Sequence, residues 1–305
     1  MKRLFVPCLF MLATSAILLV SACKLYYTPP AKTEYSINAS AAMEAEGKRL
    51  AMLMCAPCHY DSKTKQFSGK RMEDVPGFVG KIYSRNITQH PTKGIANYTD
   101  GELAFLIRTG ISRDGKLMPF MQRPNLADQD LRAIIAFLHS KDDLVRPLDA
   151  DPGRTQYTML GKMGMSQSKP LAYPAKEIAK PSDKTELGKY LVDNLSCYDC
   201  HSKSFMSINK MFPEKSKGFM GGGNKLLDIN GKTVLSRNLT FHETGIGSWS
   251  EQDLRRALTE GISKDNVVLA FPMPMFSDLK DEEVSAIYAY LKSIPAINNK
   301  VKRSR

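Results

Sequence analysis

Apolar residues recur with helical spacing at four places in the body of the chain, arranged as two similar pairs. Residues 101–110 and 251–261 each carry an apolar stripe and end at a glycine, a residue that readily terminates helices. Residues 128–140 and 281–293 begin with acidic residues, which favour a helix N-terminus, and continue with a second stripe. Patterns typical of β-strands are scarce. The chain is therefore predicted to be all-α.

The N-terminus has a different pattern. A cationic start is followed by an apolar run over residues 4–20, which is the layout of a secretory signal peptide. The run ends in Val20-Ser21-Ala22-Cys23, which resembles the lipobox of bacterial lipoproteins, where the cysteine is acylated. An ordinary signal peptide or an uncleaved anchor is the alternative. No later apolar run is long enough to span a bilayer. We therefore expect an exported protein, anchored by lipid on Cys23 at the periplasmic side of a bacterial membrane.

Charge restricts the partners. The formal net charge is +12, which favours fast, salt-sensitive association with acidic surfaces. Nucleic acid is the competing explanation for a basic chain, but lysine and arginine are spread along the sequence without a basic helix or an aromatic-rich patch. We predict protein partners with acidic docking surfaces and no nucleic acid.

Two short cysteine motifs carry the chemistry. Both read CxxCH: the first contains Cys55, Cys58 and His59, and the second contains Cys197, Cys200 and His201. In such a motif the two thiols bond covalently to the two vinyl groups of one haem, and the histidine becomes an axial ligand of the iron. A zinc ribbon would need the two pairs much closer together, and a thioredoxin-like dithiol would need a βαβ setting. The sequence therefore predicts two covalent haem c groups.

The chain repeats itself around these motifs. Each half reads as a helix, a CxxCH motif, a long loop, a helix, a methionine loop and a closing helix. The matching segments are Ser84-Arg85-Asn86-Ile87-Thr88 with Ser236-Arg237-Asn238-Leu239-Thr240, Gly110-Ile111-Ser112 with Gly261-Ile262-Ser263, Met118-Pro119 with Met273-Pro274, and Ala136-Phe137-Leu138 with Ala289-Tyr290-Leu291. The glycine-rich residues 218–223 and the lysine-rich stretch before them belong to an insertion, 202–223, for which the sequence gives no role.

On these motifs the sequence resembles the class I cytochrome c domain, twice. It is also similar to the cytochrome subunits of bacterial membrane-bound alcohol and gluconate dehydrogenases. The resemblance implies two tandem domains, each wrapped around one covalent haem. The predicted segments are a lipoprotein signal peptide (1–23), a tether (24–40), a first cytochrome domain (41–145), a linker (146–183), a second cytochrome domain (184–296) and a basic tail (297–305).

In that family the methionine before a proline is the second axial ligand of the iron. The resemblance places this role on Met118 and Met273 and the proximal role on His59 and His201. Met121 and Met275 are neighbouring rivals, because a chain with 16 methionines uses some of them as core filler. His90 and His242 occupy equivalent positions and offer a bis-histidine alternative; the other interpretation is that they are polar loop residues.

Three side chains are candidates for contacts with the haem propionates. The resemblance assigns this role to Arg85 and Arg237, and Trp249, the only tryptophan, could donate its indole N–H. Tyr98 occupies the matching place in the first half. The alternative for Trp249 is simple packing of an aromatic ring on the haem edge.

These predictions describe a diheme cytochrome c lipoprotein that moves single electrons between exported respiratory redox partners and is not itself an enzyme. Iron held by protein on both faces leaves no open site for a substrate. Two alternatives differ in kind. One is a peroxidase-like oxidoreductase with one open haem, and the other is a permanent electron-transfer subunit of a dehydrogenase or oxidase complex.

Overall fold

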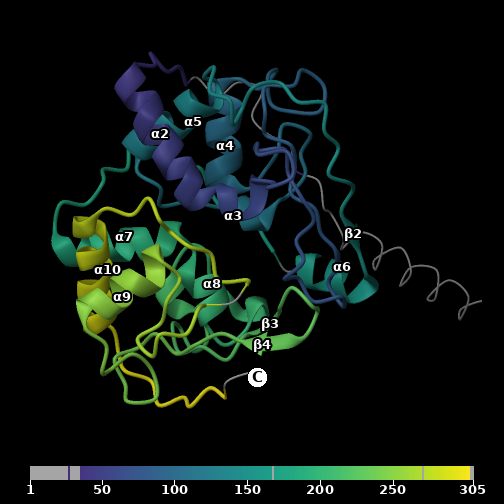
Figure 1. Ribbon diagram of the computed structural model, residues 1–305. Helices are drawn as coiled ribbons and strands as arrows, with labels where there is room; N and C mark the ends of the chain where they lie inside the picture. Colours follow the sequence, from purple (N-terminus) through teal and green to yellow (C-terminus); the bar gives the residue numbers. More distant parts are fainter. Residues whose placement is uncertain (1–26, 28–34, 167, 270, 303–305) are drawn as a thin grey trace, which may run out of the picture.

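The computed structural model describes residues 27, 35–166, 168–269 and 271–302. The predicted signal peptide, Cys23 and most of the tether lie outside the described residues. Within them the chain is mostly helical, with two small sheets (Figure 1). The helices are α2 (Ala41–Met54), α3 (Ala56–His59), α4 (Asp100–Thr109), α5 (Asp128–Leu138), α6 (Met159–Ser166), α7 (Lys184–Asn194), α8 (Cys197–His201), α9 (Glu251–Thr259) and α10 (Asp281–Ser293). Short 3-10 turns occupy Pro119–Met121, Phe205–Ser207 and Pro213–Lys215.

Both sheets are two-stranded and antiparallel. Strand β1 (Gly80–Lys81) pairs with β2 (Gln156–Tyr157), and Gly80 lies opposite Tyr157. Strand β3 (Lys225–Leu227) pairs with β4 (Thr233–Leu235) as a local hairpin. The sequence pattern did not predict these strands, because each is only two or three residues long and too short to show an alternation.

The four predicted helices form close to the predicted bounds. Thr99 caps α4 and Ser250 caps α9, each in a capping box with the acidic residue three positions later. Gly110 ends α4 in a left-handed conformation, with φ +78°. These local signals were readable from the sequence, and they confirm the helix predictions.

In each half, the helix before the CxxCH motif packs against the closing helix, α2 against α5 and α7 against α10. The helices cross at a glycine. A Cβ atom on Gly47 would lie 1.8 Å from the Ala133 carbonyl oxygen, and one on Gly188 would lie 2.0 Å from the Ala286 carbonyl oxygen. Only glycine permits so close an approach, so the crossing places both CxxCH motifs in the same way relative to their closing helices.

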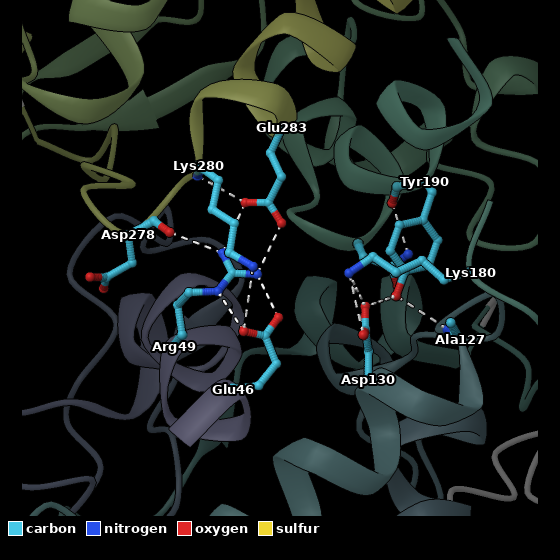
Figure 2. A network of polar contacts seen from close by, with 10 residues as sticks. Glu46, Arg49, Ala127, Asp130, Lys180, Tyr190, Asp278, Lys280 and Glu283 are labelled. Carbon is cyan, nitrogen blue, oxygen red and sulfur yellow. Dashed lines mark hydrogen bonds and ion pairs between the residues drawn. The ribbon is translucent and has the colours of Figure 1, made fainter. Parts of the chain in front are cut away.

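Polar contacts join the two halves beside the core (Figure 2). Arg49 of α2 lies between Glu46 of the same helix and Glu283 of α10. Its Nη1 atom is 2.9 Å from Oε2 of Glu283. A second contact is made by the Tyr190 hydroxyl of α7, which donates to Asp130 of α5 at 2.6 Å. Because Glu283 and Asp130 are buried, these bonds depend on one arrangement of the halves.

The segment between α5 and α7 lies along the first half. Strand β2 pairs with β1, the Ile178 amide donates to Asp128 at 2.6 Å, and the Lys169 carbonyl accepts a hydrogen bond from Gln122 at 2.9 Å. Among the described residues, no helix has both the length and the apolar character needed to cross a bilayer.

Candidate functional site

Each CxxCH motif forms a short helix directly after the first long helix of its half. Helix α3 begins next to Cys55 and ends at His59, with Pro57 in its first turn, where a proline fits without loss of a hydrogen bond. Helix α8 runs from Cys197 to His201. Ser196, the residue before it, has a left-handed backbone conformation with φ +59°. In both motifs the two cysteines and the histidine are therefore held on one tight turn.

The two motif histidines make the same hydrogen bond. Nδ1 of His59 lies 2.8 Å from the carbonyl oxygen of Arg85, and Nδ1 of His201 lies 2.8 Å from that of Arg237. Since a carbonyl oxygen only accepts, Nδ1 donates and Nε2 carries the free lone pair. Burial lowers the pKa of both imidazoles, which favours the neutral form. A neutral imidazole with a fixed tautomer is what an iron ligand requires.

A glycine with positive φ completes each histidine site. The Gly69 amide donates to the His59 carbonyl at 2.9 Å, and the Gly222 amide donates to the His201 carbonyl at 2.7 Å. A Cβ on either glycine would strike the backbone of the arginine whose carbonyl accepts from the histidine, at 2.6 Å in the first half and 2.4 Å in the second. Part of the glycine-rich stretch thus has a role that the sequence analysis missed, and its signal was the match between Gly69 and Gly222.

None of the four cysteines in the described residues is paired in a disulfide, and all four residues are partly buried. Burial raises the pKa of each thiol, to about 12 for Cys55 and Cys197. The thiols are therefore neutral and available for bond formation with an apolar group.

The packing of the methionine loops favours the predicted iron ligand in the second half but not in the first. In the second half, Met273 packs against the core, whereas Met275 is 63% exposed, which favours Met273. In the first half, Met121 packs against the core, and Met118 is partly buried outside that cluster. Packing therefore favours the rival Met121 in this loop.

The backbone register explains this asymmetry. The Met118 amide donates to the Gly110 carbonyl at 2.7 Å, but in the second half the equivalent bond runs from Leu269 to Gly261 at 2.7 Å. Met118 is thus matched by Leu269 and not by Met273, although both methionines precede a proline. The Met-Pro pairs occupy different points of two loops of unequal length.

The predicted propionate contacts are placed as follows. Arg85 is exposed, whereas the Arg237 side chain is partly buried and donates to the Val301 carbonyl at 2.9 Å. Trp249 is partly buried against the core, and its carbonyl accepts from the Tyr288 hydroxyl at 3.0 Å. Tyr98 occupies the corresponding turn and packs on the first core, with the Arg113 guanidinium 5.0 Å from its ring centre.

The side chains of His90 and His242 both accept hydrogen bonds within local turns. Nδ1 of His90 accepts from the Lys93 amide at 3.1 Å, and Nδ1 of His242 accepts from the Thr244 amide at 3.1 Å. These contacts favour the interpretation as polar loop residues over the bis-histidine alternative.

A second pair of residues in the repeated segment was missed as functional. Asn86 donates to the Leu148 carbonyl at 2.9 Å, and Asn238 donates to the Ile297 carbonyl at 2.7 Å. Each asparagine thereby ties the segment carrying the histidine acceptor to the chain that follows the closing helix. The signal was present in the two Arg-Asn-(Ile/Leu)-Thr segments, but the partners are distant in sequence.

The residues fit covalent haem. Each half offers two unpaired thiols on one turn, a buried imidazole with its acceptor in place, and a methionine packed against the same core. Thioether ligation stabilises ferrous iron and raises its reduction potential, which suits an electron carrier.

Comparison with known proteins supports this chemistry. Residues 44–142 match the cytochrome c family model. The chain is 31% identical to the fructose dehydrogenase cytochrome subunit of Gluconobacter japonicus over 79% of its length. It is 27% identical to the cytochrome c subunit of quinone alcohol dehydrogenase from Gluconobacter oxydans over 85% of its length. It covers only 50% and 56% of those two relatives.

A third relative has nearly the same length. The diheme c-type cytochrome of Cereibacter sphaeroides is 26% identical, and the alignment covers 92% of this chain and 96% of that protein. These three relatives are named as cytochromes or cytochrome subunits, in agreement with the prediction of an electron carrier. The chain therefore contains a haem-binding cytochrome c domain and is homologous to the cytochrome subunits of bacterial fructose, alcohol and gluconate dehydrogenases and to a diheme cytochrome c.

Proposed function

We propose that the chain holds two haem c groups in two tandem cytochrome c domains and carries single electrons between them and its partners. The observation that carries this proposal is the duplicated histidine site. His59 and His201 have the same burial, the same bond to an arginine carbonyl and the same glycine contact. The family model covers only the first of these sites, so the second haem rests on this equivalence and on the diheme relative.

The four cysteines would hold the haems as thioethers, and the two histidines would bind iron through Nε2. In the second half, Met273 is the proposed distal ligand, because it is packed and Met275 is exposed. In the first half, Met118 was predicted from its proline, and the packing of Met121 makes it the direct competitor. With a histidine and a methionine on opposite faces, neither iron would accept a substrate, and haem would supply only one-electron oxidation and reduction.

We further propose that the protein works as the electron-transfer subunit of an exported dehydrogenase complex. Several relatives are named as subunits of such dehydrogenases, and the basic surface suits an acidic partner. Attachment to the periplasmic face of a membrane through Cys23 belongs to the same proposal. Co-purification of a dehydrogenase with the tagged chain at low salt supports a stable subunit. Recovery of the cytochrome alone supports a shuttle instead.

The first experiment is an optical spectrum of the holoprotein in the oxidised and reduced states, with quantitation of covalent haem. Two low-spin haems per chain, with the far-red absorption of methionine-bound ferric haem, are expected. A high-spin haem that binds carbon monoxide rapidly would overturn the electron-carrier proposal and favour a peroxidase-like enzyme.

The competing methionines of the first half need separate variants. Met118→Leu and Met121→Leu are conservative in volume, so loss of the first haem's share of the far-red absorption in only one of them identifies the ligand. Met275→Leu is the matched control for the second half, because its side chain is exposed. If neither first-half variant alters the absorption, methionine does not ligate that iron.

A further inference from the structure

Charged side chains from both halves influence the thiols of the two CxxCH motifs. The second motif contributes Asp199, which lies between its two cysteines, whereas the first motif has Pro57 at that position. Lys210 lies opposite Asp199 and forms an ion pair with it. The two attachment sites are therefore chemically unequal: only the second carries a carboxylate between its cysteines.

The Asp199–Lys210 pair is shielded from water. The side chains are only 17% and 14% exposed, and Asp199 Oδ1 is buried without a hydrogen-bond partner. The Lys210 ammonium lies 5.4 Å from the ring centre of Tyr198, which is buried. In such an environment a charge is weakly screened, so either member of the pair acts strongly on its neighbours.

Two charged residues of the first half reach the same place. Arg123, from the loop before α5, donates through Nε to the Asn194 carbonyl of α7 at 3.1 Å. Burial is the main cause of the raised pKa of the Cys58 thiol, and Arg123 is the largest opposing influence. Asp74 contributes to the raised pKa of both Cys58 and Cys200, behind burial in each case. The two motifs thus face one shared group of charges.

Lys210 reaches Asp199 because the second loop is longer than the first. The chain takes ten residues from His59 to Gly69 but 21 from His201 to Gly222, and Lys210 lies in the additional length. Both loops end at a glycine whose amide donates to the carbonyl of the motif histidine. The extra residues therefore add side chains to the second loop without changing where it ends. Asn224, which follows the insertion, also holds the second motif in place. Its Nδ2 donates to the Asp199 carbonyl at 3.1 Å.

We propose that the 202–223 insertion delivers Lys210 as a fixed counter-charge to Asp199, and that this buried pair affects the reduction potential at the second attachment site more strongly than at the first. This inference rests on the proposed function, because it requires a haem at Cys197 and Cys200. Reduction adds one negative charge to the iron centre. The Asp199 carboxylate alone would oppose that step, and the Lys210 ammonium alone would favour it. Together they offset each other, and both act through the field at the haem rather than by contact with iron.

The test is a spectroscopic redox titration of the full holoprotein and four variants. Lys210→Met is expected to lower one of the two midpoint potentials, and Asp199→Asn is expected to raise the same one. The double variant should return toward the wild-type value, and the other midpoint should move much less in all three. Lys217→Met is the matched control, because it removes an exposed lysine from the same insertion.

Opposite shifts of one midpoint support the inference, because a merely structural disturbance gives the two single variants no reason to move in opposite directions. Shifts no larger than that of Lys217→Met, or shifts of the same sign, overturn it. If Lys210→Met does not fold, Lys210→Arg should keep the wild-type midpoint while Asp199→Asn still raises it. Haem content separates the two proposals. Fewer than two haems per chain contradicts the proposed function, whereas two haems with unmoved midpoints contradicts this inference alone.

Discussion

The two halves of the molecule build their helix crossings and histidine sites with the same backbone contacts but with different loops. Both cross two helices at a glycine, fix a motif histidine on an arginine carbonyl, and close the site with a glycine of positive φ. They differ in the loop after the histidine, in the methionine loop and in the residue between the motif cysteines. The contacts made by backbone atoms are duplicated, and the side chains that could tune each site are not.

This difference shows which features the two halves share. Main-chain contacts depend on chain direction and on the absence of a Cβ, so any change of register would break them. Side-chain contacts tolerate exchange when volume is kept. Phe67 and Met220, for example, occupy equivalent buried positions, each two residues before the glycine of its site. Their carbonyls accept from the Ile87 and Leu239 amides in the same way, although the two side chains differ.

The largest expected effect is the loss of one haem, which tests whether the two halves are chemically equal. Replacing Cys55 and Cys58 together by serine should halve the covalent haem per chain, and so should the matching change of Cys197 and Cys200. The reason is that covalent attachment needs both thiols of a motif. Haem quantitation under denaturing conditions measures this. If either double variant retains all of its covalent haem, the two-site proposal is wrong.

The helix crossings come next in size. Gly47→Ala and Gly188→Ala should each lower the free energy of unfolding by about 3 kcal/mol, because a methyl group would overlap a backbone carbonyl that cannot move alone. Gly77→Ala is the control, since a Cβ there would meet nothing within 4 Å. Chemical denaturation of the holoprotein gives the comparison. Equal stability of all three variants would show that the crossings are not tight.

The glycines beside the histidines should give a smaller loss with a spectroscopic signature. Gly69→Ala and Gly222→Ala should each destabilise by about 2 kcal/mol, because strain at positive φ adds to contact with the arginine backbone. Gly231 has a similar φ of +75° but open space, so Gly231→Ala should cost about 1 kcal/mol from strain alone.

Only the first two of these variants should also change the haem spectrum, because the arginine carbonyl that orients the histidine would have to shift. A spectral change in Gly231→Ala as large as in the other two would contradict this reasoning. The comparison separates backbone strain from displacement of the histidine acceptor.

The smallest effect distinguishes the halves by pH. Asp193 of α7 is buried at the position that corresponds to Met52 when Gly47 and Gly188 are matched, and burial raises the pKa of its carboxyl to about 6 despite the hydrogen bond from Lys189. The folded state then holds a proton that the unfolded state releases near pH 4. Stability should therefore fall as pH rises from about 4 to 6, as this carboxyl loses its proton first in the unfolded and then in the folded state.

Asp193→Asn should remove that part of the pH dependence. The control is Asp143→Asn, whose side chain is 88% exposed and should leave the pH profile unchanged. Unfolding measured at several pH values between 4 and 7 gives both profiles. A profile for Asp193→Asn that parallels the wild type would show that this carboxyl ionises normally in the folded state.

Much of the molecule was readable from local sequence. The helix bounds followed from capping residues and apolar stripes, because these signals act within one or two turns. The CxxCH motifs and the repeated segments named the residues of the histidine sites, because covalent haem attachment fixes both the residue types and their spacing. The Met-Pro pairs were a poor guide to register. The equivalent backbone bonds to Gly110 and Gly261 come from Met118 and Leu269, so Met273 lies further along its loop than Met118 does.

By itself, then, the sequence determined the helices, the two attachment motifs and the internal repeat, all of which depend on neighbours along the chain. Only the tertiary structure decided which carbonyl accepts from each histidine, how Lys210 meets Asp199, and that Arg49 and Tyr190 join the halves. The physical reason is distance along the chain. Each of those contacts joins segments whose separation in sequence carries no periodic or capping signal, so it becomes visible only when packing brings them together.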